Sequence, residues 1–144
     1  MAESFFRITN LVALLGWVAL VAFPGRKGVS GLLCAVLLPG TLAAAYAAVI
    51  VWRIAAAGQS PMDLGSIAGL RTAFDDDWVF AAAWTHYLVF DMVVGAWIAR
   101  DSVRLGLPWG LRTAALVLTF LAGPVGFLVH LAGRTLLRRS TTVE

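Results

Sequence analysis

The run WVFAAAWTHYLVFDMVVGAWI, residues 78–98, decides the fold class of this chain. An α-helix rises about 1.5 Å per residue, so a helical run of this length is roughly 30 Å long and matches the hydrocarbon core of a bilayer. Two of its side chains, His86 and Asp91, are of types that are often ionised, and most of the others are apolar. The run therefore predicts a membrane-spanning helix with two polar groups at the depth of the lipid chains.

Three more apolar runs extend this prediction to the whole chain. They cover residues 8–23, 29–56 and 111–131. Hydrophobic residues make up 60% of the sequence and the mean hydropathy is +0.86, which is more apolar surface than a soluble domain of this size can bury. We predict an all-α, polytopic membrane protein with four transmembrane helices in a single domain, residues 1–144. Its Ala, Gly and Arg usage favours a bacterial cytoplasmic membrane.

The polar stretch Gly58–Asp77 separates the second and third runs. Pro61 suits the first position of a helix, and apolar residues then recur at steps of three and four. These residues are Leu64, Ile67, Leu70 and Phe74. The spacing predicts a short amphipathic helix on the membrane surface between transmembrane helices 2 and 3. Asp75–Asp77 are expected to cap the third span, because carboxylates favour the positive end of a helix.

The second run contains its own irregularity. Pro39 and Gly40 predict a kink or a tilt, since proline cannot donate a backbone hydrogen bond. Tyr46, and Trp52 with Arg53, are interpreted as the interfacial end of this span.

The basic residues indicate a bilayer rather than nucleic acid as the partner. The net charge is +3, but the lysine and arginine residues flank the apolar runs, where cations meet lipid headgroups. With four spans, both termini lie on one side, and five Lys/Arg then face six across the membrane. This difference leaves the orientation open. Cys34 is the single cysteine, which excludes an internal disulfide.

Ionisable groups inside a bilayer cost several kcal/mol, so each needs a structural or functional reason. His86, Asp91 and His130 meet this condition. If the third and fourth spans are antiparallel, His86 and His130 open onto one cavity from the same side, with Asp91 slightly deeper. His86 and Asp91 are about 140° apart around the helix, so each needs a partner from another helix. Arg53 is one partner considered for Asp91; a protonated carboxyl is the other possibility, because desolvation favours the neutral form.

The fourth run carries a face of small residues. Its members are Thr119, Gly123, Gly126, His130 and Gly133, at steps of four, three, four and three. Such a face lets another helix approach closely and favours homo-oligomers. Asp101, beside Arg100 and Arg104, is expected to form an ion pair at the interface.

Two strings carry a resemblance to a known family. One is AWTHYLVFD, residues 83–91, followed by Asp101, and the other is GPVGFLVH, residues 123–130. They resemble the abscisic-acid-deficient-four-like family of membrane proteins, which includes plant neoxanthin synthase. The resemblance implies isomerisation of a carotenoid or other isoprenoid lipid, in which an epoxide opens and an allene forms. On this hypothesis Asp91 is the acid, His86 or His130 is the base, and Asp101 is a further catalytic candidate.

The same residues allow other functions. A non-catalytic subunit that binds pigment or lipid, or that serves assembly, would have its polar residues fully paired. A small transporter or proton relay would need a polar path through the membrane. A metal site of two histidines and one aspartate lacks a clear fourth ligand. We therefore predict no metal and no cofactor, and whether the chain is an enzyme stays open.

Overall fold

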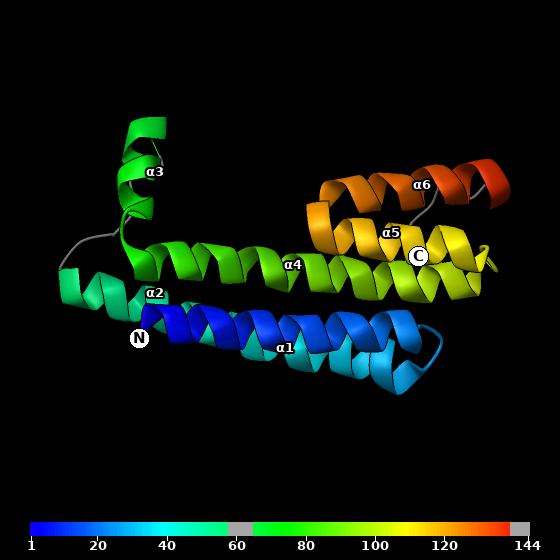
Figure 1. The fold of residues 1–144 in the computed structure, drawn as a ribbon, viewed down its shortest axis with the longest axis horizontal. Coiled ribbons are helices and arrows are strands. Elements are labelled where there is room, and N and C mark those ends of the chain that lie inside the picture. The colour runs from blue at the N-terminus through cyan, green and yellow to red at the C-terminus, as the bar shows by residue number, and fades with distance from the viewer. Residues whose placement is uncertain (58–64, 139–144) are drawn as a thin grey trace.

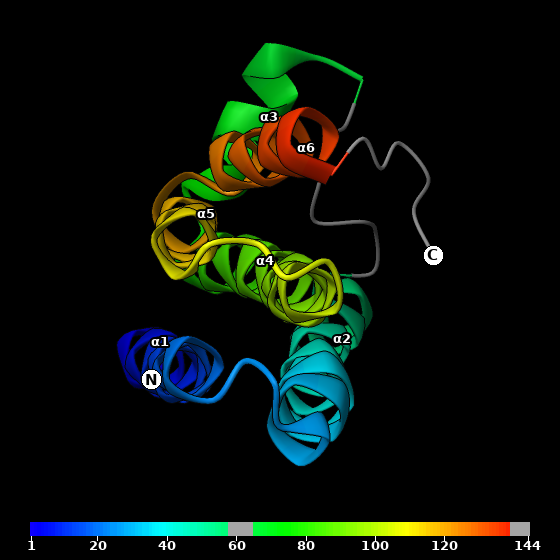
Figure 2. The same ribbon diagram turned by 90° about the vertical axis from the view of Figure 1, so that its right-hand side faces the viewer.

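The computed structural model describes residues 1–57 and 65–138, which form helices and connecting turns with no strand (Figures 1 and 2). Three helical stretches are long and apolar enough to cross a membrane. They are α1 (Ala2–Ala22), the stretch Lys27–Ala56, and α4 (Asp77–Arg104), with 21, 30 and 28 residues. The prediction of an all-helical membrane protein is confirmed at this level.

The second long stretch begins as a π-helix, η1 (Lys27–Leu37), and continues as α2 (Leu38–Ala57). The change comes one residue before Pro39, whose missing N–H prevents a regular i to i−4 hydrogen bond at this point. The irregularity that Pro39 predicts therefore takes the form of wider π-helical turns. Cys34, within these turns, lies against α1 and donates to the carbonyl of Gly16 at 3.5 Å.

Helix α4 is the centre of the molecule. It contacts every other helix in residues 1–57 and 65–138, and the end-on view places it between α1, α2 and α5 (Figure 2). Small residues bring its neighbours close. A Cβ atom on Gly95 would lie 2.4 Å from the ring of Trp17, and one on Gly16 would lie 2.8 Å from Met92. These contacts allow α1 to pack closely against the middle of α4.

The prediction of one continuous fourth span over 111–131 is wrong. This part forms α5 (Trp109–Ala122) and α6 (Pro124–Arg138), two helices that fold back on each other (Figure 1). Gly123 lies between them with φ +32°, a conformation that favours glycine, and Pro124 fits the first position of α6. With 14 residues, α5 is about 21 Å long, too short to cross a bilayer. We call α5 and α6 the C-terminal hairpin.

The face of small residues closes this hairpin on itself. All five of its members are buried. A Cβ atom on Gly126 would lie 2.1 Å from the backbone nitrogen of Thr119, and one on Gly133 would lie 2.4 Å from Leu111. The small residues of α6 thus pack against α5, the first half of the same apolar run, rather than against a separate span.

The predicted surface helix is α3 (Ile67–Phe74), which lies crosswise at the N-terminal end of α4 (Figure 1). It starts later than expected, because Ser66 is its N-cap and accepts from the Gly69 N–H at 2.9 Å. The predicted start at Pro61 lies outside the described residues, and the position of α3 on the membrane surface stays a prediction. Asp76 caps α4 as predicted, with Oδ1 accepting from Trp78 and Val79 at 2.9 and 3.1 Å.

The hairpin changes the distribution of charge between the two ends of the molecule. Because α6 returns to the C-terminal end of α4, the described cations divide seven to three. Seven lie at the end where α4 finishes: Arg26, Lys27, Arg100, Arg104, Arg112, Arg134 and Arg138. Three lie at the other end with four carboxylates: Arg7, Arg53 and Arg71, with Glu3, Asp75, Asp76 and Asp77. The positive-inside rule predicts that the cation-rich end faces the cytoplasm.

This orientation is testable by cysteine labelling. In a Cys34→Ala background expressed in bacteria, we expect Ile67→Cys to react with a membrane-impermeant maleimide in intact cells. Gly110→Cys, at the cation-rich end, should react only after lysis. The Cys34→Ala parent controls for background labelling. The reverse pattern would contradict the assignment.

Candidate functional site

The four predicted site residues lie at three separate places along α4. His86 lies on the side that faces α2, as its ring contact with Tyr46 shows. Asp91 lies beside the turn of the C-terminal hairpin, and Asp101 joins His130 of α6 near the end of α4. His86 and Asp101 are fifteen residues apart, about 22 Å along the helix.

The predicted cavity shared by His86 and His130 is therefore wrong. A straight fourth span would carry His130 towards the start of α4, into the half of the helix that contains His86. The break at Gly123 instead reverses the chain, so α6 runs back towards the end of α4 and brings His130 to Asp101. The expectation that His86 and Asp91 lie on different faces agrees with their different neighbours.

Asp101 and His130 form the centre of a buried polar cluster. The Nε2 of His130 is 2.8 Å from Oδ2 of Asp101, and the same carboxylate pairs with Arg104 at 2.8 Å and with Arg134 at 3.3 Å. The His130 ring meets the Trp97 ring edge-on at 4.9 Å, and the Arg134 guanidinium lies 5.5 Å from that ring. Asp101 therefore forms the predicted ion pair with Arg104, but as a buried residue that also joins α4 to α6.

The hydrogen bonds indicate the tautomer of His130. Ionised Asp101 accepts, so Nε2 carries the proton and Nδ1 is left to accept from the Ser102 hydroxyl, 3.4 Å away. His130 lies in α6, outside the three long helices. Its pKa is lowered, chiefly because burial disfavours the charged imidazolium, and the hydrogen bond and charge of Asp101 act in the opposite direction. With His130 at 0% and Asp101 at 3% exposure, this pair is closed to solvent and joins α4 to α6.

Asp91 contrasts with Asp101 because it makes no hydrogen bond or ion pair among the described residues. It is half-buried against the hairpin turn, and a Cβ atom on Gly123 would lie 2.8 Å from its Oδ1. The suggested pairing with Arg53 is wrong, since Arg53 pairs with Asp76 at the start of α4. Asp91 is thus a carboxyl group near the middle of a spanning helix, packed onto backbone.

His86 lies at the junction of two grooves between α2 and α4. One, of about 280 Å³, includes Ile50, Phe74 and Tyr87, and the other, of about 320 Å³, includes Val89 and Phe90. Both are lined by His86 and Tyr46, so they adjoin, and we call them together the His86 groove. The rings of Tyr46 and His86 meet edge-on with centroids 5.7 Å apart, and the Phe90 ring lies 4.8 Å from that of His86.

Tyr46 is the residue that the sequence interpretation missed. We assigned it to the membrane interface, but it lies eleven residues, about 16 Å, from the end of α2 and contacts His86. Its central position within the run 29–56 was the available signal, because an interfacial tyrosine belongs near the end of a span.

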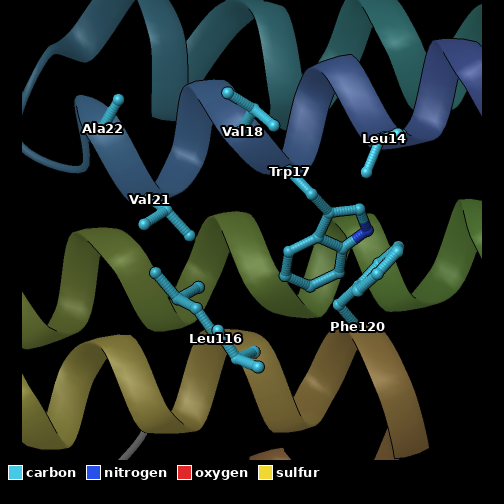
Figure 3. A pocket seen from close by; sticks show the side chains of 8 residues that line it. Leu14, Trp17, Val18, Val21, Ala22, Leu116 and Phe120 are labelled. Atoms are coloured by element: carbon cyan, nitrogen blue, oxygen red, sulfur yellow. The ribbon is translucent and has the colours of Figure 1, made fainter.

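A further groove, of about 350 Å³, lies between α1 and α5 (Figure 3). Trp17 and Phe120 meet across it with ring centroids 5.6 Å apart, and Leu14, Val21 and Leu116 line the rest. It contains no ionisable side chain, so it suits an apolar chain and offers no acid or base. Among residues 1–57 and 65–138, no three or more His, Cys, Asp or Glu side chains are grouped to hold a metal ion.

The two aspartates of α4 provide a matched test of the buried cluster. Asp101→Asn removes the anion that Arg134 and Arg104 require, so we expect it to lower the free energy of unfolding by roughly 3 kcal/mol. Asp91→Asn, which breaks no described hydrogen bond, should change it by less than about 1 kcal/mol. Equilibrium denaturation in mixed detergent micelles measures both values. A loss of less than about 1 kcal/mol for Asp101→Asn would show that Asp101 does not stabilise the hairpin.

Comparison with known proteins agrees with the resemblance found in the sequence. The model of the ABA DEFICIENT 4-like family matches residues 4–130, which include nearly all of α1, the other two long helices, the hairpin turn and His130. No curated protein and no solved structure is significantly similar to the chain. The match covers most of the 144 residues, and the chain therefore belongs to the ABA DEFICIENT 4-like family.

Proposed function

We propose that the protein binds an isoprenoid lipid of the carotenoid type in the His86 groove and isomerises it by acid–base chemistry. The observation that carries this proposal is the composition of the groove. Its walls are mostly apolar or aromatic, and a few polar groups, His86, Tyr46 and Tyr87, converge on it. Lipid-binding sites need this combination, in which apolar walls hold the chain and few polar groups fix its orientation.

The position of the groove suits a substrate that arrives from the bilayer. His86 is exposed on the surface of α4, nine residues or about 14 Å from the start of that helix, at the depth of the lipid chains. Phe90, beside it, is 59% exposed. An extended polyene can therefore lie along the surface between α2 and α4 without first entering water.

The proposed reaction is balanced by two proton transfers. A proton reaches the epoxide oxygen as its C–O bond breaks, and another leaves carbon as the new double bond forms, so the composition of the lipid is unchanged. His86 is the proposed base. We propose the hydroxyl of Tyr46 as the acid in place of Asp91, because Asp91 packs against Gly123 while Tyr46 faces His86.

A non-catalytic lipid-binding role is the second candidate. It is supported by the apolar groove of Figure 3, which can hold a chain but lacks reactive groups. A proton relay has less support, because Asp91 and Asp101 are ten residues apart, about 15 Å, and Asp101 is buried within its cluster.

We propose the bacterial cytoplasmic membrane as the location.

The test compares isoprenoid lipids from cells with and without the gene by mass spectrometry. We expect one isomer to appear with the wild-type chain and to fall by roughly a hundredfold or more with His86→Ala, because the base is lost. Tyr46→Phe should also lower it, since only the hydroxyl is removed. Val93→Ala is the control, because Val93 is exposed on α4 but does not line the groove.

Two results would count against the proposal. Identical lipid profiles with and without the gene would contradict isomerase activity, and lipid that co-purifies with the inactive chain would then favour the binding role. If the His86→Ala variant kept its isomerase activity, the base would have to be a residue other than His86.

A further inference from the structure

A basic pocket lies at the cation-rich end of the molecule, far from the His86 groove. Its volume is about 230 Å³, and it lies between the turn after α1, the start of η1 and the end of α4. Three of its lining residues are cationic: Lys27, Arg100 and Arg104. We call it the basic pocket.

The local structure holds these cations together. Arg100 donates to the backbone carbonyl of Ser30, which fixes the end of α4 against η1. Arg104 pairs with Asp101 at 2.8 Å, and Lys27 is exposed at the first position of η1. The first N–H groups of a helix have no acceptor within it, so the start of η1 adds partial positive charge to the same place.

Carboxylates are few at this end of the molecule among the residues that the structure describes. Asp101 is the one carboxylate among the described residues at this end, and it already serves Arg104, Arg134 and His130. Lys27, Arg100 and Arg104 give the pocket a positive potential, which attracts anions. The pocket therefore has the charge and the shape of an anion site.

Its position indicates where the anion comes from. The pocket lies at the level where α1 and α4 end, which is the depth of lipid headgroups. Pro24 and Val103 give it apolar walls, and Ala22, two residues before Pro24, lines the apolar groove of Figure 3. An amphiphile with its phosphate in the pocket thus has apolar surface next to it.

We propose that the basic pocket binds the phosphate group of an anionic phospholipid from the leaflet at the cation-rich end. Basic pockets between transmembrane helices are a known means of headgroup recognition. Bound lipid would join η1 to α4 through Lys27, Arg100 and Arg104. The proposal does not depend on any chemistry at His86.

Native mass spectrometry of the full chain in a neutral detergent tests this proposal, with phosphatidylglycerol as the anionic probe and phosphatidylcholine as the neutral one. We expect the wild-type chain to bind phosphatidylglycerol more tightly by roughly tenfold. The double variant Lys27→Gln/Arg100→Gln should lose most of this preference, because each cation near an anionic lipid contributes about a factor of five.

The matched control is Arg26→Gln/Arg112→Gln, which removes the same charge from the same end. Neither residue lines the pocket, and the Arg26 guanidinium packs on the Phe23 ring. It should keep the preference within about twofold. Equal losses in both double variants, or no preference in the wild type, would overturn the proposal.

Two further measurements address the folding of the variants and competition from free phosphate. If Arg100→Gln disturbs folding, Lys27→Gln alone should still weaken binding by about fivefold, because the exposed Lys27 side chain has no described hydrogen bond. Unchanged binding by a folded Lys27→Gln chain would contradict the site.

Displacement of phosphatidylglycerol by an equal concentration of inorganic phosphate would assign the pocket to free phosphate and overturn the lipid source.

Discussion

The buried carboxylate of Asp101 is the constraint on which the C-terminal half of the structure depends. A charge inside a membrane protein is tolerated only with partners, and here the partners come from the same helix and from α6. His130 and Arg134 can reach Asp101 only if α6 runs back towards the end of α4. The chain reversal at Gly123 thus brings to the Asp101 carboxylate the partners that it needs. The glycines of α6 allow the two helices of the hairpin to pack closely.

This arrangement separates stability from the proposed function. Asp101, His130 and Arg134, which join the hairpin to α4, are buried, whereas His86 lines a groove on the α2 side of the same helix. The hairpin also collects cations at one end, which gives the molecule its charge asymmetry and surrounds the basic pocket. Helix α4 therefore contributes to three separate places along its length: the His86 groove, the contact with the C-terminal hairpin and the basic pocket.

The sequence was sufficient for the features that depend on local composition. Apolar length predicted the three long helices, and Asp76 was correctly placed at the start of α4. It was insufficient for the fourth apolar run, because hydropathy does not distinguish one span from two half-length helices, and the face of small residues fits either. His130 was consequently placed at the wrong end of α4. Tyr46 was missed because its contact with His86 depends on how α2 is aligned with α4, which no local pattern encodes.

The C-terminal hairpin is tested most directly by the distance between its two ends. Spin labels at Gly110→Cys and Leu136→Cys, in a Cys34→Ala chain in lipid bilayers, can be measured by pulsed electron paramagnetic resonance. Adjacent antiparallel helices predict roughly 10–25 Å once the label linkers are included. A single straight helix between these residues predicts about 40 Å, and that result would contradict the hairpin and the pairing of His130 with Asp101.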